Sequence, residues 1–505
     1  MSDSTYPARR TGGGQRPAPR HNLTEGPIGR TLFMFALPVL GGNALQSLNG
    51  TVNAFWVSHS LGVAAVTAIS NANIIMMLML GAVFGVSMAA NILVAQSFGA
   101  DDMPMVKKVV GTANTFFVVL STTLALIGYW LTPQILKLIH TPIDAQPEAI
   151  AYLQVIFVAM PFMYYFAFMQ MAQRGGGDSR TPFYFMLLAV VLDSGFNPLL
   201  IRGIGPFPKM GIAGSATATL IGQGVSLVCL MAYLYARNSH LVLRGREFRH
   251  LRPDASILKA LVFKGLPMGV QMLVMSGAAV AMIQFVNRFG SLTTAAYGAS
   301  SQVWMYVQMP AMALSAAVSS MAAQNVGAQR WDRVNRVARV GVGMGLALTG
   351  TVVVLIYLLS QWVLMLFLPS GSAALPIAHH ISGIATWSFM ALSITFTLFG
   401  VVRATGAVWP PLFILICSMW VIRVPFAGLL IPRLGADAIW WSFPMGTISS
   451  AALASLYYRF GNWRKSRFME TDVHGQSAMG GGLSPPAMDG LDDPLSVGEG
   501  LAAES

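Results

Sequence analysis

An acid and an amide, Asp193 and Asn197, stand four residues apart in the mostly apolar run LLAVVLDSGFNPLLI, residues 187 to 201. Residues at this spacing lie on one face of an α-helix. An ionised carboxylate at the centre of a membrane helix costs about 2.5 to 3.5 kcal/mol, so it persists where it faces a polar interior and has a function or a partner there. Asp193 is therefore either a group that exchanges a proton or a Na⁺, or a structural residue that is protonated or held by amides.

A stripe of amides on an earlier apolar segment, residues 31–57, offers a matching polar face. At 100° per residue, its members fall within about 120° of arc. They are Asn43, Gln46, Asn49 and Asn53. Such a stripe faces protein or water rather than lipid. We predict that Asn43, Gln46 and Asn49 line a cavity; hydrogen bonding that only holds helices together is the alternative.

We predict a cation-coupling cluster made of Asp193, Asn197, Asn53 and a hydroxyl from the segment 211–236, such as Thr217. A Na⁺ site needs several oxygen ligands, whereas a proton needs only one carboxylate. Asp193 is the single acid that lies well inside a predicted span. We therefore favour H⁺ as the coupling ion and keep Na⁺ as the alternative.

The second half of the chain has no acid inside its predicted spans, but it carries Arg423 within ICSMWVIRVPFAGLL. Such an arginine either reaches towards a membrane interface or lines the cavity, where it would repel cationic substrates. Both alternatives stay open from the sequence, and we include Arg423 among the predicted cavity-lining residues. We predict no metal site.

These polar groups belong to a chain of 505 residues, of which 55% are hydrophobic and only 10% are charged. The mean hydropathy is +0.61. Ordinary soluble chains carry roughly a quarter charged residues, and a bilayer requires apolar runs of about 20 residues. The sequence thus predicts an all-α polytopic membrane protein with twelve transmembrane helices. Their expected ranges are 31–57, 63–92, 107–131, 148–172, 182–202, 211–236, 259–287, 293–325, 337–368, 376–400, 409–431 and 436–460.

Lysine and arginine concentrate in alternate connections between these spans, for example in residues 237–258 and 330–339. Cytoplasmic loops carry this excess, so we expect both termini in the cytoplasm and the chain in a cell membrane of the bacterial inner-membrane type. Basic residues spread over such loops favour anionic lipid headgroups as partners and do not form a nucleic-acid patch. The ends, residues 1–28 and 464–505, have the composition of disordered cytoplasmic segments.

The chain also contains an internal repeat. AQSFGADDMPMVKKVV at 95–110 aligns with AQNVGAQRWDRVNRVA at 323–338, an offset of 228. An offset of 229 maps Pro38 onto Pro267 and Pro182 onto Pro411. Because six spans separate equivalent points, both halves have the same orientation, which predicts two parallel-repeat six-helix lobes. The expected domains are an N-lobe at 29–236, a cytoplasmic interlobe linker at 237–258 and a C-lobe at 259–463.

Motifs at these positions resemble those of the multidrug and toxic compound extrusion family, over residues 29 to 462. They are LP at 37–38 and 266–267, the turns AQSFGA and AQNVGA, QRGGGDSRTP after the fourth span, NPLLIRGIG closing the fifth, and MGIAGSATAT opening the sixth. The resemblance implies a twelve-helix, two-lobed, cation-coupled exporter with a central cavity. In the family an aspartate is common at the position of Asn53, and the fifth-span pair often reads Asn then Asp, whereas this chain reads Asp193 then Asn197. This departure leaves the coupling ion and its ligands open.

The sequence favours a secondary active multidrug exporter that exchanges H⁺ or Na⁺ for amphipathic, often cationic small molecules by alternating access. A flippase or exporter of lipid-linked sugars or another lipidic substrate is the alternative, although it would place more cationic residues in the cavity than Arg423. We expect no enzyme, because no catalytic pairing of His and acid is visible inside the spans. The Walker motif GxxxxGKS/T does not occur, so we expect no nucleotide and no other cofactor. We also expect a monomer.

Overall fold

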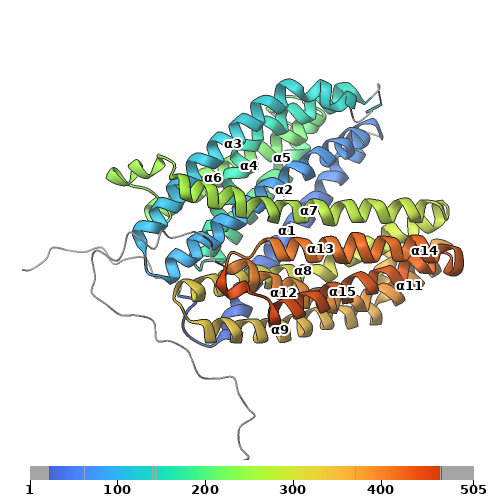
Figure 1. Ribbon diagram of the computed structural model, residues 1–505. Helices are drawn as coiled ribbons and strands as arrows, with labels where there is room; N and C mark the ends of the chain where they lie inside the picture. Colours follow the sequence, from blue (N-terminus) through green and yellow to red (C-terminus); the bar gives the residue numbers. More distant parts are fainter. Residues whose placement is uncertain are drawn as a thin grey trace, which may run out of the picture. The chain divides into compact units, whose positions relative to one another are not determined.

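The computed structural model describes residues 22–61, 63–138, 141–142, 145–369, 371–466 and 468. Their regular structure is helical (Figure 1). In these ranges, nine helical segments are long and apolar enough to cross a membrane. Three further long helices bring the number of long helical segments in the described ranges to the twelve predicted; they are α2 (Val63–Gly99), α8 (Ser291–Gly327) and α15 (Asp437–Phe460). The predictions for residues 1–21 and for most of 464–505 lie outside the described residues.

Six helices form the N-lobe. They are α1 (Ile28–Leu61), α2 (Val63–Gly99), α3 (Met103–Leu138), α4 (Gln146–Gly175), α5 (Arg180–Arg202) and α6 (Ile212–Ala236). The ends of α5 follow from local chemistry. Asp178 accepts hydrogen bonds from the backbone N–H groups of Arg180 and Thr181 and so satisfies the first turn. Gly203, at a φ of 70°, takes the left-handed conformation that ends the helix.

The C-lobe holds the other six spans. Three are α7 (Ala255–Asn287), α8 (Ser291–Gly327) and α9 (Trp331–Leu358), which the short helix α10 (Ser360–Met365) follows. The tenth consists of α11 (Ala374–Ala385), η2 (Thr386–Ser388) and α12 (Phe389–Ala404). The eleventh consists of α13 (Trp409–Ile416), the π-helix η3 (Cys417–Arg423) and α14 (Val424–Leu434), and the twelfth is α15 (Asp437–Phe460).

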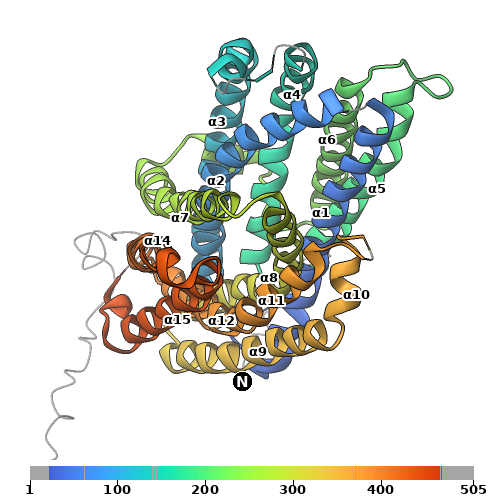
Figure 2. The same ribbon diagram turned by 90° about the vertical axis from the view of Figure 1, so that its right-hand side faces the viewer.

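The two lobes repeat one pattern of helix contacts. In the N-lobe, α1 packs on α5, α2 on α4, and α6 on both α4 and α5; Figure 2 shows α1, α5 and α6 side by side. Six spans later, α7 packs on α13, α8 on α12, and α15 on both α12 and α14. Between the lobes, α1 contacts α8 while α2 contacts α7, and α2 also contacts α8. A two-fold exchange of the lobes reproduces these contacts, which confirms the predicted two-lobe architecture.

The repeated AQxxGA turns meet each other where α2 and α8 end. The Gln96 side-chain amide donates to the carbonyl of Ala404 at 2.6 Å, and that of Gln324 donates to the carbonyl of Gly175 at 2.9 Å. A Cβ on Gly99 would come within 1.9 Å of the Gln324 carbonyl oxygen, and one on Gly327 within 2.0 Å of the Gln96 carbonyl oxygen. We call Gln96, Gly99, Gln324 and Gly327 the turn clasp, because each lobe binds the other through the same two residues.

Residues 22–27, part of the end expected to be disordered, have a fixed place on the C-lobe. The Leu23 side chain is 4% exposed, its N–H donates to Gln324 Oε1 at 3.0 Å, and its carbonyl accepts from Asn325. Arg330 donates to the Thr24 carbonyl at 2.7 Å. Composition alone predicted disorder in this segment. It could not show that the hydrogen-bond partners of this backbone lie about three hundred residues away in the sequence. The order therefore comes from tertiary hydrogen bonds.

The interlobe linker, residues 237–254, is bound to α3. Lys107 forms an ion pair with Glu247 at 2.9 Å, and Thr115 donates to the carbonyl of Leu251. Gly111 lies so close to His250 that an added Cβ would come within 2.3 Å of its carbonyl oxygen. The linker ends at Asp254, four residues before the predicted end at 258, because Asp254 caps the first turn of α7.

Candidate functional site

Asp193 and Asn197 lie inside the N-lobe on one face of α5. Both side chains are buried, with exposed fractions of 4% and 1%. α5 can approach α6 closely here because Gly222 has no side chain: an added Cβ would lie 3.3 Å from the Cβ of Asp193 and 2.8 Å from the Ala189 carbonyl oxygen. The carboxylate is therefore held between helices, away from lipid.

Two amides of α1 bind these two side chains. Asn49 donates to Asp193 Oδ2 at 2.7 Å, and Asn197 donates to Asn53 Oδ1 at 3.1 Å. Ser194 donates to Asn49 Oδ1 at 3.3 Å. The spacing of four residues on α1 matches the spacing of four on α5, so the two helices form two rungs of polar contacts. The structure thus brings Asp193, Asn197 and Asn53 together.

The hydroxyl groups that reach this cluster come from Ser215 and Thr219 of α6. Ser215 donates to Asn53 Oδ1 at 2.6 Å, and Thr219 donates to Asp193 Oδ1 at 3.2 Å. The predicted Thr217 instead donates to the backbone carbonyl of Ala213 at 2.8 Å. Positions 215 and 219 share a helix face, whereas position 217 is rotated by about 200° from 215. The prediction therefore named the right helix and the wrong face.

The Asp193 carboxylate accepts its hydrogen bonds from neutral groups. Each carboxylate oxygen accepts one hydrogen bond from an uncharged donor. Within the described ranges, no Lys, Arg or His forms an ion pair with it. The oxygen of the Asn197 amide is buried and accepts no hydrogen bond. Tyr152 of α4 is also buried and lies beside Asp193 and Asn53. The site is rich in acceptor oxygens and can take up a proton or a small cation.

The other amides of the α1 stripe lie outside this cluster. Asn43 is partly exposed and Gln46 is exposed, whereas Asn49 is bound to Asp193 as described. Sequence reasoning missed Tyr152, Ser194, Ser215 and Thr219. The signal for the last two was present, because a serine and a threonine four residues apart make a polar stripe on α6. Nothing in the sequence around Tyr152 distinguishes it from other aromatic residues of the spans.

Arg423 ends the π-helix η3, in the middle of the eleventh span. It lies inside the C-lobe with an exposed fraction of 8%, and its guanidinium carbon stands 3.7 Å from the centre of the Phe443 ring. Nη1 contacts the sulfur of Met419 at 3.6 Å, and Nε is buried without a hydrogen-bond partner. Its side chain points across the lobe towards α15, against Phe443 and Gly446.

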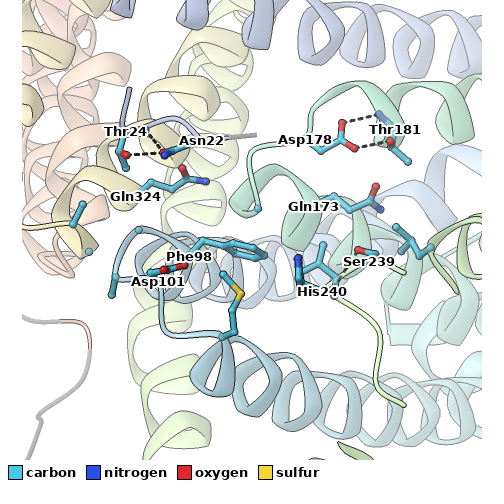
Figure 3. A pocket seen from close by; sticks show the side chains of 18 of the residues that line it. Asn22, Thr24, Phe98, Asp101, Gln173, Asp178, Thr181, Ser239, His240 and Gln324 are labelled. Atoms are coloured by element: carbon cyan, nitrogen blue, oxygen red, sulfur yellow. Dashed lines mark hydrogen bonds between the residues drawn. The ribbon is translucent and has the colours of Figure 1, made fainter. Parts of the chain in front are cut away.

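A pocket of about 1030 Å³ lies between the lobes at the turn clasp (Figure 3). Phe98 of α2, Gln173 of α4, His240 of the linker, Gln324 of α8 and Thr24 all contribute to its lining. The pocket includes both turns of the clasp, so any opening of the lobes at this end must change its shape.

Comparisons with known proteins agree with this architecture. A family model, MatE, matches residues 38–199 and again 267–429. The chain is 37% identical over 456 residues to the probable multidrug resistance protein YoeA of Bacillus subtilis, covering 90% of this chain and 98% of that protein. It is 32% identical over 448 residues to the probable multidrug resistance protein YpnP of Bacillus subtilis, covering 88% and 98%.

Among solved structures, the fold is similar to that of a multidrug resistance MATE family transporter of the MOP superfamily in an outward-facing conformation. The TM-score is 0.81 at 20% sequence identity, and the alignment covers 88% of this chain and 98% of that one. The family model thus matches once in each lobe, and its two matches begin 229 residues apart, which is the offset read from the repeat. The chain belongs to the MatE family of membrane transporters.

Proposed function

We propose that this protein is a secondary active multidrug exporter, which exchanges H⁺ for amphipathic small molecules by alternating access. One observation carries the proposal: the Asp193 carboxylate is buried among neutral hydrogen-bond donors, with no cationic partner in the described residues. A carboxylate in this position gains a counter-charge only by taking up a proton or a cation. Its charge state then depends on which side of the membrane it faces.

The names of two relatives support small-molecule drugs as the proposed cargo. Two proteins that align with this chain along nearly their whole length are named as probable multidrug resistance proteins. We extend that cargo to this chain as a proposal. Both termini and the linker then lie in the cytoplasm of a bacterial inner membrane, where basic loops contact anionic headgroups. We propose a monomer, since one chain contains both lobes.

The coupling ion is proposed to be H⁺. A proton needs only Asp193, whereas Na⁺ needs several oxygen ligands at once. Most of the other acceptors in the cluster are already engaged: Asn53 Oδ1 accepts from Ser215 and Asn197, and Asn49 Oδ1 accepts from Ser194. Asn197 Oδ1 is the free amide oxygen here that would serve Na⁺ best. Sodium therefore stays the alternative that the experiment must decide.

The turn clasp supports the alternating-access part of the proposal. Its two hydrogen bonds and two glycine contacts join the lobes at one end, and they do so with backbone groups that can separate without unfolding a helix. A lobe that rocks about the membrane midplane would break these contacts and expose the pocket beside them. When the lobes are joined at this end, the substrate reaches the bundle from the opposite side of the membrane.

The test is transport by the purified protein in proteoliposomes, with rhodamine 123 as a cationic dye. An inside-acid pH gradient should drive dye accumulation, because protons that leave would exchange for dye that enters. A Na⁺ gradient of the same size at constant pH should drive none. Accumulation on the Na⁺ gradient alone would replace H⁺ by Na⁺, and no accumulation on either gradient would reject the exporter.

A further inference from the structure

The segment that leads into α1, residues 22–27, lies on the C-lobe; we call it the strap. Besides the hydrogen bonds described above, Nη2 of Arg333 in α9 donates to the backbone carbonyls of Glu25 and Gly26 at 2.7 and 2.9 Å. The Leu23 side chain is buried as well. The strap therefore precedes the first helix of the N-lobe in the chain, yet its backbone is hydrogen-bonded to the C-lobe.

One side chain joins the strap to the turn clasp. Gln324 accepts from the Leu23 N–H through Oε1 and donates through Nε2 to the carbonyl of Gly175 in the N-lobe. A side-chain amide has its acceptor and its donors on one planar group, so a hydrogen bond to the oxygen also sets the direction of the nitrogen. The strap thus holds Gln324 in the orientation that closes the clasp.

α1 crosses from one lobe to the other. Near its start, an added Cβ on Gly29 would lie 3.7 Å from Val340 of α9, whereas one on Gly41 would lie 2.8 Å from the Phe183 ring of α5. The beginning of α1 therefore rests on the C-lobe and a later turn rests on the N-lobe. If the lobes part at this end, the N-lobe pulls on α1 while the strap holds its beginning on the C-lobe.

The strap also forms part of the pocket between the lobes (Figure 3). Thr24 and Glu25 line this pocket together with Phe98 and Arg180 of the N-lobe. The strap is therefore one of the surfaces that the C-lobe presents to the N-lobe at the clasp. Its hydrogen bonds to the C-lobe can break without unfolding a helix, because residues 22–27 precede α1.

We propose that the strap is a latch, which favours the state in which the lobes are closed at the turn clasp. The inference rests on the proposed alternating-access function and adds a control to it: the strap sets the fraction of molecules that are open at this end. A substrate that binds only the open molecules has an apparent affinity reduced by that fraction. A weaker latch should therefore lower the KM for a substrate that enters from the pocket side.

The test begins with Arg333→Gln, which removes both hydrogen bonds from this side chain to the strap and leaves the clasp unchanged. A net hydrogen bond changes an equilibrium constant by about two- to tenfold. We expect the KM for rhodamine 123 uptake into inverted membrane vesicles to fall at least threefold. Arg336→Gln, an exposed position on the same helix, removes the same charge and should leave the KM within twofold of the parent.

A second measurement reports the opening directly. Gln173 lines the pocket and is 2% exposed, so Gln173→Cys, in a background without Cys229 and Cys417, places a thiol that the closed lobes cover. Adding Arg333→Gln should speed its labelling by a membrane-impermeant maleimide at least threefold. Leu23→Ala, which weakens the strap outside every helix, should do the same and covers the case that the arginine variant does not fold.

Each other result overturns the latch. Labelling as slow as in the parent would mean that the strap rests on the C-lobe without holding the lobes closed. Equal acceleration by Arg336→Gln would assign the effect to lost charge. Faster labelling with an unchanged KM would separate the strap from substrate entry. If the parent takes up no dye, the proposed exporter is rejected, whereas the labelling rates still decide whether the strap holds the lobes closed.

Discussion

The N-lobe and the C-lobe share one arrangement of helices and differ sharply at its centre. In the N-lobe, Asp193 is surrounded by amides and hydroxyls, with a donor on each of its oxygens. In the C-lobe, Arg423 lies on the equivalent span among Phe443, Tyr297 and Met419. The same scaffold therefore holds an acid in a polar network and a base in an aromatic one.

The difference separates two tasks. A carboxylate can be neutralised by a proton, so a site built on Asp193 can change its charge during each cycle. An arginine keeps its proton, so a site built on Arg423 has constant charge and can only bind or release an anion. The comparison teaches that a repeated fold can hold a group that titrates in one lobe and a group of constant charge in the other. At the turn clasp, by contrast, the two lobes are alike.

The largest effect is expected for Asp193→Asn. The variant should fold, because an amide of the same size is cheaper to bury than a carboxylate, but uphill export should fall at least a hundredfold. One charge moving through about 100 mV supplies about 2.3 kcal/mol, enough for a substrate gradient of roughly 50-fold, and the variant has no group to use it. Dye accumulation against its gradient is the measurement, with the exposed Asp437→Asn as control. Uphill pumping at the parent rate would make Asp193 structural.

Variants of the turn clasp test whether the two lobes are equivalent where they meet. Alanine at Gly99 or at Gly327 would put a methyl group within about 2 Å of a carbonyl oxygen of the other lobe, so the clasp must open. We expect at least a tenfold loss of export from each variant, with the two within twofold of each other. Labelling of a cysteine at position 100, in a background without Cys229 and Cys417, should become faster in both.

Gly343→Ala is the control for the clasp, because nothing lies within 4 Å of its added Cβ. A strong effect at Gly99 with none at Gly327 would show that the lobes are not equivalent at this end.

A smaller effect tests which hydroxyl group of α6 binds the Asp193 carboxylate. Thr219→Ala removes one of the two donors to the Asp193 carboxylate and should slow proton-driven export about tenfold, since hydrogen bonds to charged groups contribute about 1.5 to 3 kcal/mol. Thr217→Ala should change the rate less than twofold, because its hydroxyl bonds only its own helix in the structure. Equal rates for the two variants would mean that the face of α6 has been assigned incorrectly.

The smallest effect concerns the linker, which is bound to the first lobe through Lys107 and Glu247. Burial acts to raise the pKa of Glu247, but the hydrogen bonds from Lys107 and from the Arg244 backbone, together with the positive charge of Lys107, outweigh it and hold this pKa below its ordinary value of 4.5. The ion pair therefore stabilises the fold above about pH 4.5, and this stability is lost as the pH falls through the lowered pKa. Glu247 is 38% exposed and screened, so we expect well under about 1 kcal/mol.

Melting temperatures in detergent provide the measurement for the linker. Glu247→Gln should melt slightly below the parent at pH 7, and the difference should disappear as the pH falls through the lowered pKa of Glu247 and should shrink at high salt. A difference that grows on acidification would contradict the assignment.

The sequence predicted the spans and the two lobes well, because apolar length and repeat offset are local properties of the chain. It predicted Asp193, Asn197 and Asn53 as one cluster, because a buried acid demands polar neighbours. It could not select Thr219 over Thr217, since that choice depends on the rotation of α6 about its axis. The place of Arg423 was equally inaccessible, because its contact with Phe443 depends on how η3 and α15 pack against each other.

The N-terminal residues 22–27 have a consequence for the order of biosynthesis. The partner of the Leu23 N–H, Gln324, follows it by 301 residues. At about 5 to 20 residues per second, a ribosome needs roughly 15 to 60 seconds to make that stretch. Leu23 therefore leaves the ribosome long before its partner exists, and its segment can dock only after α8 has been synthesised and placed beside α1. Protection of this segment from proteolysis would consequently report when the second lobe has been completed.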